Sequence, residues 1–291
     1  MSDTILVLGG AGFLGQHIIK ELTDNNFSKV ACADMAPANM KGALTFQVDI
    51  LDYTALEEIV KHYDLIINCA GQITDPIHNS LLLNTKGMNN IVRAALKYNR
   101  KIVHISSVAV YGTSDFADEN TPLNPETPYA ALKAFSEYLI TNSLPKEQYI
   151  ILRLSNLFGK NQPKGIFGYL EKSYKTDKGL HFNNNGELRR YYLHVEDCSK
   201  FIVNLVRHQN ISGIFNVRGP EKYSIQDLVH LFEKSANIHF TVHYEPSKPL
   251  ENIQNLSDDK IKTIVGIHYQ HSIENFIKKE FLTTQRPEKI K

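Results

Sequence analysis

The sequence predicts an α/β fold in which a doubly wound parallel sheet is joined to a smaller, mixed α/β lobe. Over its first half, short apolar runs rich in β-branched residues alternate with longer segments of helical periodicity. Strands and helices that alternate in this way form βαβ units, whose strands pair in parallel. The apolar runs show little alternation with polar residues, as expected for strands covered on both faces.

Each expected strand is a short apolar run bounded by polar or turn residues. In order, these strands are Ile5–Leu8, Lys29–Ala33, Leu44–Val48, Leu65–Cys69, Lys101–Ile105 and Tyr149–Leu154. The helices expected between them are Phe13–Leu22, Thr54–Tyr63, Leu81–Leu96 and Tyr129–Thr141. Thr54 and Glu57 have the spacing of a capping box, and Pro128 suits the entry to the last helix.

After Leu154 the alternation weakens, and the remaining residues are expected to form most of the smaller lobe. Gly159–Gly165 reads as a loop and Asn183–Gly186 as a turn. Helices are expected at Phe167–Tyr174, Asp197–Arg207 and Gln226–Lys234, with Ser224 capping the last. The charged tail after Phe281 is expected to fray.

Charge excludes some classes of partner. The chain has 291 residues, with 32 lysines and arginines against 31 aspartates and glutamates, so its formal net charge is +1. Such a chain lacks the broad basic surface that nucleic acids or anionic membranes attract. Neither is therefore an expected partner, and any anionic ligand must be held locally by a few cations or backbone amides.

The cysteines and the N-terminus indicate a reducing compartment. Cys32, Cys69 and Cys198 are widely spaced and form no CxxC pair, which argues against a disulfide framework or a zinc ribbon. The N-terminus runs directly into the first expected strand, without the basic and apolar regions of a signal peptide. No apolar stretch reaches transmembrane length. We expect a soluble, cytoplasmic protein.

A glycine-rich loop joins the first strand to the first helix. Within Leu6–Gly15, the three key glycines are Gly9, Gly12 and Gly15. In a dinucleotide-binding loop the first allows a tight turn, the second lets the backbone approach a pyrophosphate, and the third permits close helix packing. The N–H groups and positive dipole end of the helix then face the phosphates.

An acidic residue ends the next strand. Asp34 lies 19 residues after Gly15 (34 − 15), near the position where a carboxylate bonds ribose hydroxyls. We favour this ribose-binding role over a structural turn with a solvated aspartate, because the strand, the glycines, the helix and the acid occur together. A carboxylate would repel a 2′-phosphate, so NAD is expected rather than NADP. Asp49 is either a turn residue or an adenine contact. The pattern predicts a Rossmann domain.

A tyrosine and a lysine share one face of the helix expected after Pro128. Tyr129 and Lys133 are four residues apart, and we expect the lysine charge to lower the pKa of the phenol. Such a phenol can exchange a proton with a hydroxyl while its carbon is oxidised or reduced. Ser107, at the end of an expected strand, could bond the same oxygen, whereas Ser106 reads as structural. No G-x-S-x-G hydrolase motif is present.

With these motifs, the chain resembles an extended short-chain dehydrogenase/reductase of the NAD-dependent nucleotide-sugar epimerase/dehydratase family. The strings that carry the resemblance span most of the chain: GGAGFLG, NTKGMNNIVRAA (Asn84–Ala95), HISSVAVYG (His104–Gly112), PETPYAALKAFSE, LRLSNLFG (Leu152–Gly159) and RYYLHVED (Arg190–Asp197). The alignment makes Ser107, Tyr129 and Lys133 the catalytic residues.

The resemblance implies further residue roles. Contacts to NAD are expected from Gly9, Gly12, Phe13, Leu14, Gly15, Asp34, Met35, Asp49, Ile50, Cys69, Ala70, Gly71, Asn84, Tyr129, Lys133 and Leu154. Asn84 would contact the cofactor or brace its neighbouring strand. Substrate contacts are expected from Ser107, Asn156, Arg190 and Lys248, with the last three at the diphosphate. The alternative for Lys248 is a solvated loop lysine.

The same resemblance implies where the two lobes divide. Residues 1–155 would form the NAD-binding domain, and residues 187–217 would return to it. Residues 156–186 and 218–291 would form the substrate-binding lobe. A homodimer is also implied, through the helices around Leu81–Leu96 and Tyr129–Thr141.

Two residues after Ser107 depart from the dehydratase pattern. Dehydratases of the family carry an acidic pair there, whereas this chain has Val108 and Ala109. Neither can move a proton, so dehydration is disfavoured, as is decarboxylation in the branch that keeps the glutamate. The chemistry that remains is oxidation or reduction at one sugar carbon, and C4 is the first candidate. Tyr191 and Leu132 are further departures, which affect the expected shape of the pocket.

Three alternatives define the competing hypotheses. The leading function is a nucleotide-sugar 4-epimerase, and the rival enzyme is an NAD(P)H-dependent reductase of 4-keto-6-deoxysugars. A non-catalytic NAD-sensing regulator would usually have lost Tyr129 or Lys133. The histidine pairs His268 with His271 and His239 with His243 could suggest a metal, but no carboxylate or cysteine evidently completes either set, so no metal is expected.

Overall fold

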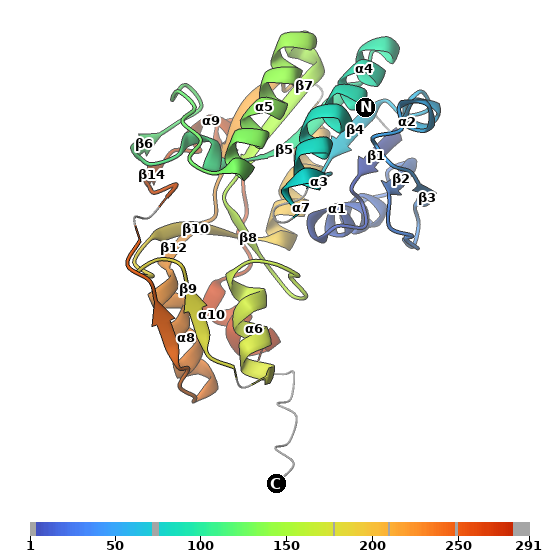
Figure 1. The fold of residues 1–291 in the computed structure, drawn as a ribbon. Helices are drawn as coiled ribbons and strands as arrows, with labels where there is room; N and C mark the ends of the chain where they lie inside the picture. The colour runs from blue at the N-terminus through green and yellow to red at the C-terminus, as the bar shows by residue number, and fades with distance from the viewer. Residues whose placement is uncertain (1–3, 72–75, 177, 209, 248–249, 282–291) are drawn as a thin grey trace.

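A seven-stranded sheet, parallel throughout, forms the centre of the protein (Figure 1). The computed structural model describes residues 4–71, 76–176, 178–208, 210–247 and 250–281. Its strand order is β11-β7-β5-β4-β1-β2-β3. These strands are β1 (Thr4–Leu8), β2 (Lys29–Asp34), β3 (Leu44–Gln47), β4 (Leu65–Asn68), β5 (Lys101–Ser107), β7 (Tyr149–Leu154) and β11 (Gly213–Val217).

Helices cover both faces of the sheet. One face carries α1 (Phe13–Asp24), α7 (Val195–Val206) and the short α9 (Asp259–Lys262), and the other carries α2 (Tyr53–Val60), α4 (Met88–Tyr98) and α5 (Pro128–Ser143). Because of this cover, every residue of β4 and β7 is buried. Burial on both faces explains why these strands are almost uninterrupted apolar runs in the sequence.

The strand order places a switch point between β1 and β4. From β1 the chain runs outward to β3 on one side, and it then crosses back to β4 on the other. At such a point the loops that leave the carboxyl ends of the two strands diverge, and ligands bind between them. The glycine loop follows β1, so the fold puts it at this place.

The smaller lobe has its own sheets and its own core. Its main sheet contains β8 (Asn156–Phe158), β10 (Arg189–His194) and β12 (Glu221–Ser224), and β9 (Leu180–Phe182) pairs with β13 (Val242–Tyr244). Helices α6 (Ile166–Thr176), α8 (Ile225–Ala236) and α10 (Ile273–Phe276) enclose a core rich in aromatic rings. A separate pair, β6 (Ser114–Ala117) with β14 (Ile253–Leu256), joins the C-terminal segment to the loop after β5.

Most predicted elements are confirmed, with boundaries that move by a few residues. The predicted capping box at Thr54 is wrong: α2 begins one residue earlier, and the Asp52 carboxylate accepts the Ala55 N–H at 3.1 Å. The predicted helix Leu81–Leu96 is instead α3 (Ile77–Leu82), a π-helical turn (Leu83–Gly87) and α4. None of the described helices could cross a bilayer.

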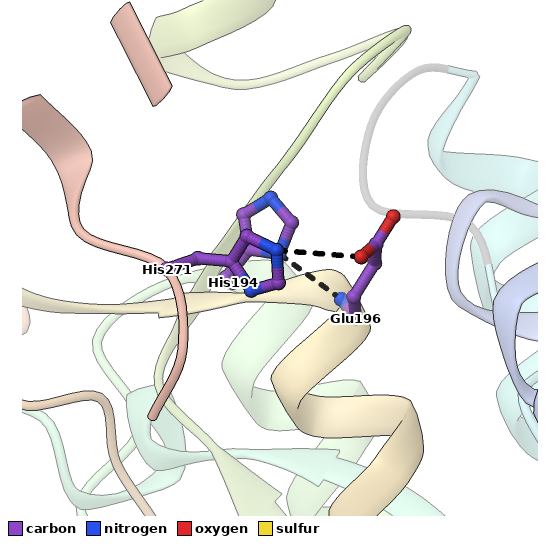
Figure 2. A group of neighbouring side chains, drawn as sticks. All are labelled: His194, Glu196 and His271. Atoms are coloured by element: carbon purple, nitrogen blue, oxygen red, sulfur yellow. Dashed lines mark hydrogen bonds and ion pairs between the residues drawn. The ribbon is translucent and has the colours of Figure 1, made fainter. Parts of the chain in front are cut away.

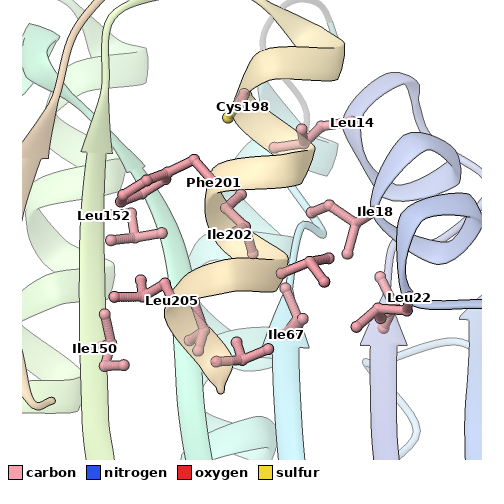
Figure 3. Close-up of a cluster of buried hydrophobic side chains, with 14 of the residues drawn as sticks. Leu14, Ile18, Leu22, Ile67, Ile150, Leu152, Cys198, Phe201, Ile202 and Leu205 are labelled. Carbon is pink, nitrogen blue, oxygen red and sulfur yellow. The ribbon is translucent and has the colours of Figure 1, made fainter. Parts of the chain in front are cut away.

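Helix α7 is the central apolar element of its face. Figure 3 shows its side chains between those of α1 and those of the sheet, with Ile202 near Ile18 and Leu205 near Ile150. Both α7 residues have no exposed surface. Since α7 follows directly from β10, its docking also connects the main sheet to the smaller lobe.

We expect Leu205→Ala to lower the free energy of unfolding by about 2–5 kcal/mol, because it leaves a cavity between α7 and the sheet. Urea unfolding measures the change. Leu44→Ala is the matched control, since Leu44 on the edge strand β3 is 53% exposed, and we expect a change below about 1 kcal/mol. Similar losses for both variants would contradict this packing.

Candidate active site

Two glycines let the loop after β1 lie against its neighbours. Gly9 has φ +71°, and a β-carbon there would be 2.7 Å from the Ala70 nitrogen. A β-carbon on Gly15 would be 2.3 Å from the Gly9 carbonyl oxygen. Any side chain at either position would force the backbone apart, so these positions require glycine.

Gly12 leaves the start of α1 open. A β-carbon there would meet only the Gly9 carbonyl oxygen, at 3.1 Å. No side chain caps α1, so the N–H groups of its first turn lack a partner within the helix. Phe13 and Leu14 begin this turn. The open cradle, the N–H groups and the dipole end fit a pyrophosphate.

Asp34 holds the glycine loop in place. Its carboxylate, at the end of β2, accepts the N–H groups of Ala11 and Ala36, each at 3.0 Å. The neighbouring Met35 is 60% exposed. The carboxylate therefore has a bracing role that the sequence did not reveal, at the place where the ribose is expected.

Asp49 and Ile50 form a turn after β3. The Asp49 carboxylate accepts the Leu51 N–H at 2.9 Å, which is the turn geometry considered for this residue. Ile50 is buried, and its carbonyl accepts the Asn90 side chain at 2.9 Å. These contacts fix the loop between β3 and α2.

Tyr129 and Ser107 meet at the carboxyl end of β5. Tyr129 is the second residue of α5, and Ser107 is the last residue of β5. Burial raises the pKa of Tyr129 to about 12, a hydrogen bond with Ser107 lowers it, and the Glu251 charge raises it. Lys133 is not among the groups that shift this pKa, so the expected lowering of the Tyr129 pKa by Lys133 stays a prediction.

Lys133 lies one turn further along α5 and points elsewhere. Its ammonium group donates to the Ile105 carbonyl at 3.0 Å. Burial lowers its pKa to about 8, while Cys69 and Glu137 raise it. A lysine with that pKa still carries its charge at neutral pH. It therefore places a buried cation between β5 and the end of β4.

The segment after β4 lies against this lysine. A β-carbon on Gly71 would be 2.9 Å from the Lys133 ammonium nitrogen. Cys69 and Ala70 come just before, and burial raises the pKa of the Cys69 thiol to about 12, so it stays neutral. Leu154, at the end of β7, is buried. The carboxyl ends of β4, β5 and β7 thus enclose the catalytic candidates.

Asn84 braces α5, the helix that carries Tyr129 and Lys133. Its side-chain amide donates to the Ser80 carbonyl at 2.8 Å, and the Ser136 hydroxyl of α5 donates to the Asn84 carbonyl at 3.1 Å. The brace therefore acts on α5. The sequence had suggested a brace on the neighbouring strand instead.

A buried ion pair, which sequence reasoning missed, fixes α5 to the sheet. Glu137 is one turn beyond Lys133, and Arg153 lies in β7; the side chains are 3% and 4% exposed and approach to 2.6 Å. The Ser106 hydroxyl donates to Glu137 at 2.5 Å, and Arg153 donates to the Tyr111 hydroxyl at 2.7 Å. The sequence did contain a signal for this pair, because Arg153 is a charged residue inside the apolar run YIILRL.

A pocket lies beside Ser107. Its hollow is about 380 Å³, open solvent included, and its described lining is Val108, Ala109, Ser155, Asn156, Arg189, Arg190, Tyr191, Glu251, Ile253 and Leu256. Asn156 and Arg190, both expected at a diphosphate, therefore share one cavity. Lys248, the third expected contact, lies outside the described residues.

Glu251 is a second residue that the sequence did not single out. It has φ +57° and is 10% exposed at its side chain, 3.6 Å from the Arg190 guanidinium. The Thr127 hydroxyl, at the N-cap of α5, donates to its carboxylate at 2.5 Å. A carboxylate therefore sits between the arginine of the pocket and the start of the catalytic helix.

His194, Glu196 and His271 form a cluster at the start of α7 (Figure 2), with potential ligand atoms within 4.8 Å of one another. Contrary to the sequence interpretation, His271 does meet carboxylates: Asp197 at 2.9 Å and Glu196 at 3.4 Å. The two imidazole rings stack at 3.9 Å. Lone pairs lie in the ring planes, so stacked rings cannot both direct them at one ion.

His194 instead acts as a helix cap. Its Nδ1 accepts the Glu196 N–H at 3.3 Å. Burial lowers its pKa to about 3, with His271, His17 and Lys200 acting in the same direction. A neutral ring suits this acceptor role, and we assign the cluster to the docking of α7.

The chain is similar to known proteins in sequence and in fold. A sequence model described as "NAD dependent epimerase/dehydratase family" matches residues 5–217. A putative UDP-glucose 4-epimerase of Methanocaldococcus jannaschii is 31% identical, over 85% of this chain and 86% of the relative.

Solved structures share the fold. A UDP-glucuronic acid 4-epimerase from Bacillus cereus, in complex with UDP-glucuronic acid and NAD, superposes with a TM-score of 0.86 at 24% identity, covering 96% of this chain and 98% of the other. A UDP-glucose 4-epimerase from Thermus thermophilus, in complex with NAD, gives 0.81 at 24% identity, covering 94% and 96%.

We expect Arg153→Met to cost about 3–5 kcal/mol of stability, because it leaves the Glu137 charge buried and unpaired. The double variant Arg153→Met/Glu137→Leu should lose less, since neither charge remains. Urea unfolding gives both values, and Lys20→Met in the exposed Lys20–Asp24 pair serves as control. A double variant with a lower free energy of unfolding than Arg153→Met would contradict the role of the buried pair.

A second prediction concerns pH. The pKa of Lys133 is about 8 in the fold against an ordinary value of 10.5, so between these values the unfolded chain holds a proton that the folded chain has lost. Stability conferred by this residue should rise with pH through that window, by up to about 3 kcal/mol. The unfolding free energy of the wild type minus that of Lys133→Met measures it; a difference independent of pH would refute it.

Proposed function

The chain belongs to the NAD-dependent epimerase/dehydratase family, and on that premise we propose that it is a nucleotide-sugar 4-epimerase. The observation that carries the proposal is the placement of Tyr129, at the start of α5, beside Ser107, at the end of β5, with Lys133 one turn further along α5. The glycine loop and the pocket of Asn156 and Arg190 lie on either side of the catalytic candidates along this edge.

The residues divide the reaction between them. Bound NAD would supply the hydride acceptor and donor for the sugar carbon, while the hydroxyl group exchanges only a proton. Ser107 holds the sugar hydroxyl against the Tyr129 phenol, and Tyr129 takes the hydroxyl proton and gives it back. Because burial raises the pKa of Tyr129 to about 12, the phenol needs positive charge nearby to act as a base. The Lys133 ammonium provides a buried one.

The fit of NAD rests on features of this chain. The open cradle at Gly12 and the uncapped start of α1 accept a pyrophosphate, and Asp34 stands where the ribose would lie. The remaining cofactor contacts proposed are Gly9, Phe13, Leu14, Gly15, Met35, Asp49, Ile50, Cys69, Ala70, Gly71, Asn84 and Leu154. We keep the expected division, residues 1–155 with 187–217 as the cofactor domain and residues 156–186 with 218–291 as the substrate lobe, with two changes: β10 pairs within the sheet of the smaller lobe, and α9 packs on the main sheet.

The two side chains that follow Ser107 favour oxidation and reduction without elimination of water. Val108 and Ala109 line the pocket, and neither side chain can exchange a proton. Elimination of water needs an acid and a base next to the sugar, so a 4-epimerase or a 4-ketoreductase fits better than a dehydratase. The presence of both Tyr129 and Lys133 argues against a regulator without activity.

Exposed apolar side chains support the proposal of a homodimer. Ile77 and Leu81 on α3 are 52% and 46% exposed, and Phe135 and Tyr138 on α5 are 41% and 61% exposed. Helices α3 and α5 contact each other, so these side chains belong to neighbouring elements of the helical face. A second copy of the chain would bury them.

We expect Tyr129→Phe to lose turnover by about 100-fold or more while NAD binding is kept, because only the hydroxyl that moves the proton is removed. Tyr98→Phe removes a hydroxyl of α4 that donates to Glu57 at 3.3 Å, and it serves as the matched control. Turnover with saturating substrate and NAD titration by calorimetry measure both. Turnover of Tyr129→Phe near that of the wild type would overturn the catalytic assignment.

The balance of cofactor separates the two enzyme candidates. An epimerase interconverts two sugars with no net change in NAD, whereas a ketoreductase consumes one NAD(P)H for each product. We expect sugar interconversion without net change in nicotinamide absorbance. Stoichiometric loss of NADH or NADPH with a 4-keto sugar, and no interconversion, would establish the reductase instead.

A further inference from the structure

We propose that His181 and His243 form a binding site for Zn²⁺ or a similar divalent transition-metal ion on the smaller lobe. The two histidines are 62 residues apart in the chain (243 − 181). Spacing in the sequence suggests His239 as the neighbour of His243, whereas the fold places His243 beside His181. Neither histidine belongs to the described pocket lining, so the site goes beyond the proposed function.

The small sheet of β9 and β13 sets the two histidines side by side. Its strands are parallel, and their register pairs His181 directly with His243. Side chains of paired residues leave a sheet on the same face. The opposite face is fixed to the core, because Phe182 is buried and its ring stacks on Tyr244 with centroids 5.5 Å apart. Both histidines are exposed, so an ion can reach them from solvent.

The distance between the two imidazole rings suits two bonds to one ion. A Zn–N bond of about 2.0–2.1 Å, added to about 1.1 Å from nitrogen to ring centre, places the ion about 3.2 Å from each ring centroid. The centroids of His181 and His243 are 5.0 Å apart, so the two lines to the ion meet at about 100°, near the tetrahedral angle. Rotation of exposed side chains directs both lone pairs at the ion, and the strands need not move.

The tilt of the rings distinguishes this pair from the cluster at α7. An ion bonded to two imidazoles lies in the plane of both rings. The rings of His181 and His243 are tilted by 46°, so a point close to both can lie in both planes. The rings of His194 and His271 are within 16° of parallel and are stacked at 3.9 Å, so their planes do not meet near the rings.

A carboxylate can complete the set of ligands. Glu245 lies two residues after His243, and its N–H donates to the Phe182 carbonyl at 2.9 Å, so the ladder continues past the end of β13. Side chains two residues apart on a strand share a face, and Glu245 is exposed there. Two imidazoles and a carboxylate, with water in the fourth position, are a known zinc environment.

A bound ion would connect two very short strands. β9 and β13 have three residues each, and a two-stranded sheet of this size has little stability of its own. The ion binds both histidines only when the strands are paired, so its binding free energy adds to the stability of the folded lobe. The expected role of the ion is therefore to stabilise the smaller lobe.

Isothermal titration calorimetry of the tag-free protein with ZnCl₂ tests the site. We expect zinc to bind with a Kd below about 0.1 mM and to raise the Tm of the wild type. MgCl₂ at the same concentration should do neither, because Mg²⁺ prefers oxygen ligands. A weaker Kd for zinc, or an equal response to Mg²⁺, would overturn the inference.

His181→Asn and His243→Asn each remove one ligand from an exposed position. We expect each to weaken zinc binding by about 10-fold or more, since the loss of a mere outer-shell partner already costs that much. His239→Asn is the matched control, because its side chain is 96% exposed on the same lobe. Unchanged Kd values in both pair variants would refute the site, as would an equal loss in His239→Asn.

The cluster at α7 is the competing location for the ion. His271→Asn removes a histidine from that cluster, and we expect the Kd for zinc to stay within about 2-fold of the wild-type value. If His271→Asn abolishes binding while both pair variants keep it, the ion belongs to that cluster and the inference is wrong. Glu245→Gln should weaken binding less than either pair variant, and an unchanged Kd would exclude Glu245 as a ligand.

Discussion

The buried pair of Glu137 and Arg153 is the interaction on which the geometry of the proposed catalytic site depends. It joins α5, which carries Tyr129 and Lys133, to β7 in the middle of the sheet. Two charges with so little exposure are stable only because they satisfy each other and the hydroxyls around them. The pair therefore fixes the rotation of α5, and with it the approach of Tyr129 to Ser107.

From this anchor the site extends along one edge of the sheet. Parallel strands bring their carboxyl ends to the same side, so segments distant in sequence meet there. In the proposed function, the glycine loop and Asp34 would bind the dinucleotide, and Ser107 with the start of α5 would form the reacting centre. The smaller lobe supplies Arg190 and Glu251 across the pocket. A chain of nearly zero net charge thus concentrates its anion-binding groups locally.

The sequence predicted what depends on local pattern. Strands buried on both faces are apolar runs, and Gly9 and Gly15 mark positions where a β-carbon would collide with backbone. Contacts between distant segments were missed: Asp52 outcompetes Thr54 as a cap, Asp34 also braces the glycine loop, His271 meets Asp197 across 74 residues, and Glu251 reaches the site only because β14 pairs with β6. Such partners are set by topology, which periodicity does not encode.

The fate of the hydrogen on C4 tests the account most directly. UDP-glucose carrying deuterium at C4 can be incubated with the protein and NAD, and the sugar nucleotides analysed by mass spectrometry. The account predicts a C4 epimer that keeps the deuterium, because Tyr129 exchanges only the hydroxyl proton and the carbon-bound hydrogen never reaches water. An epimer whose deuterium has been replaced by solvent hydrogen would contradict it.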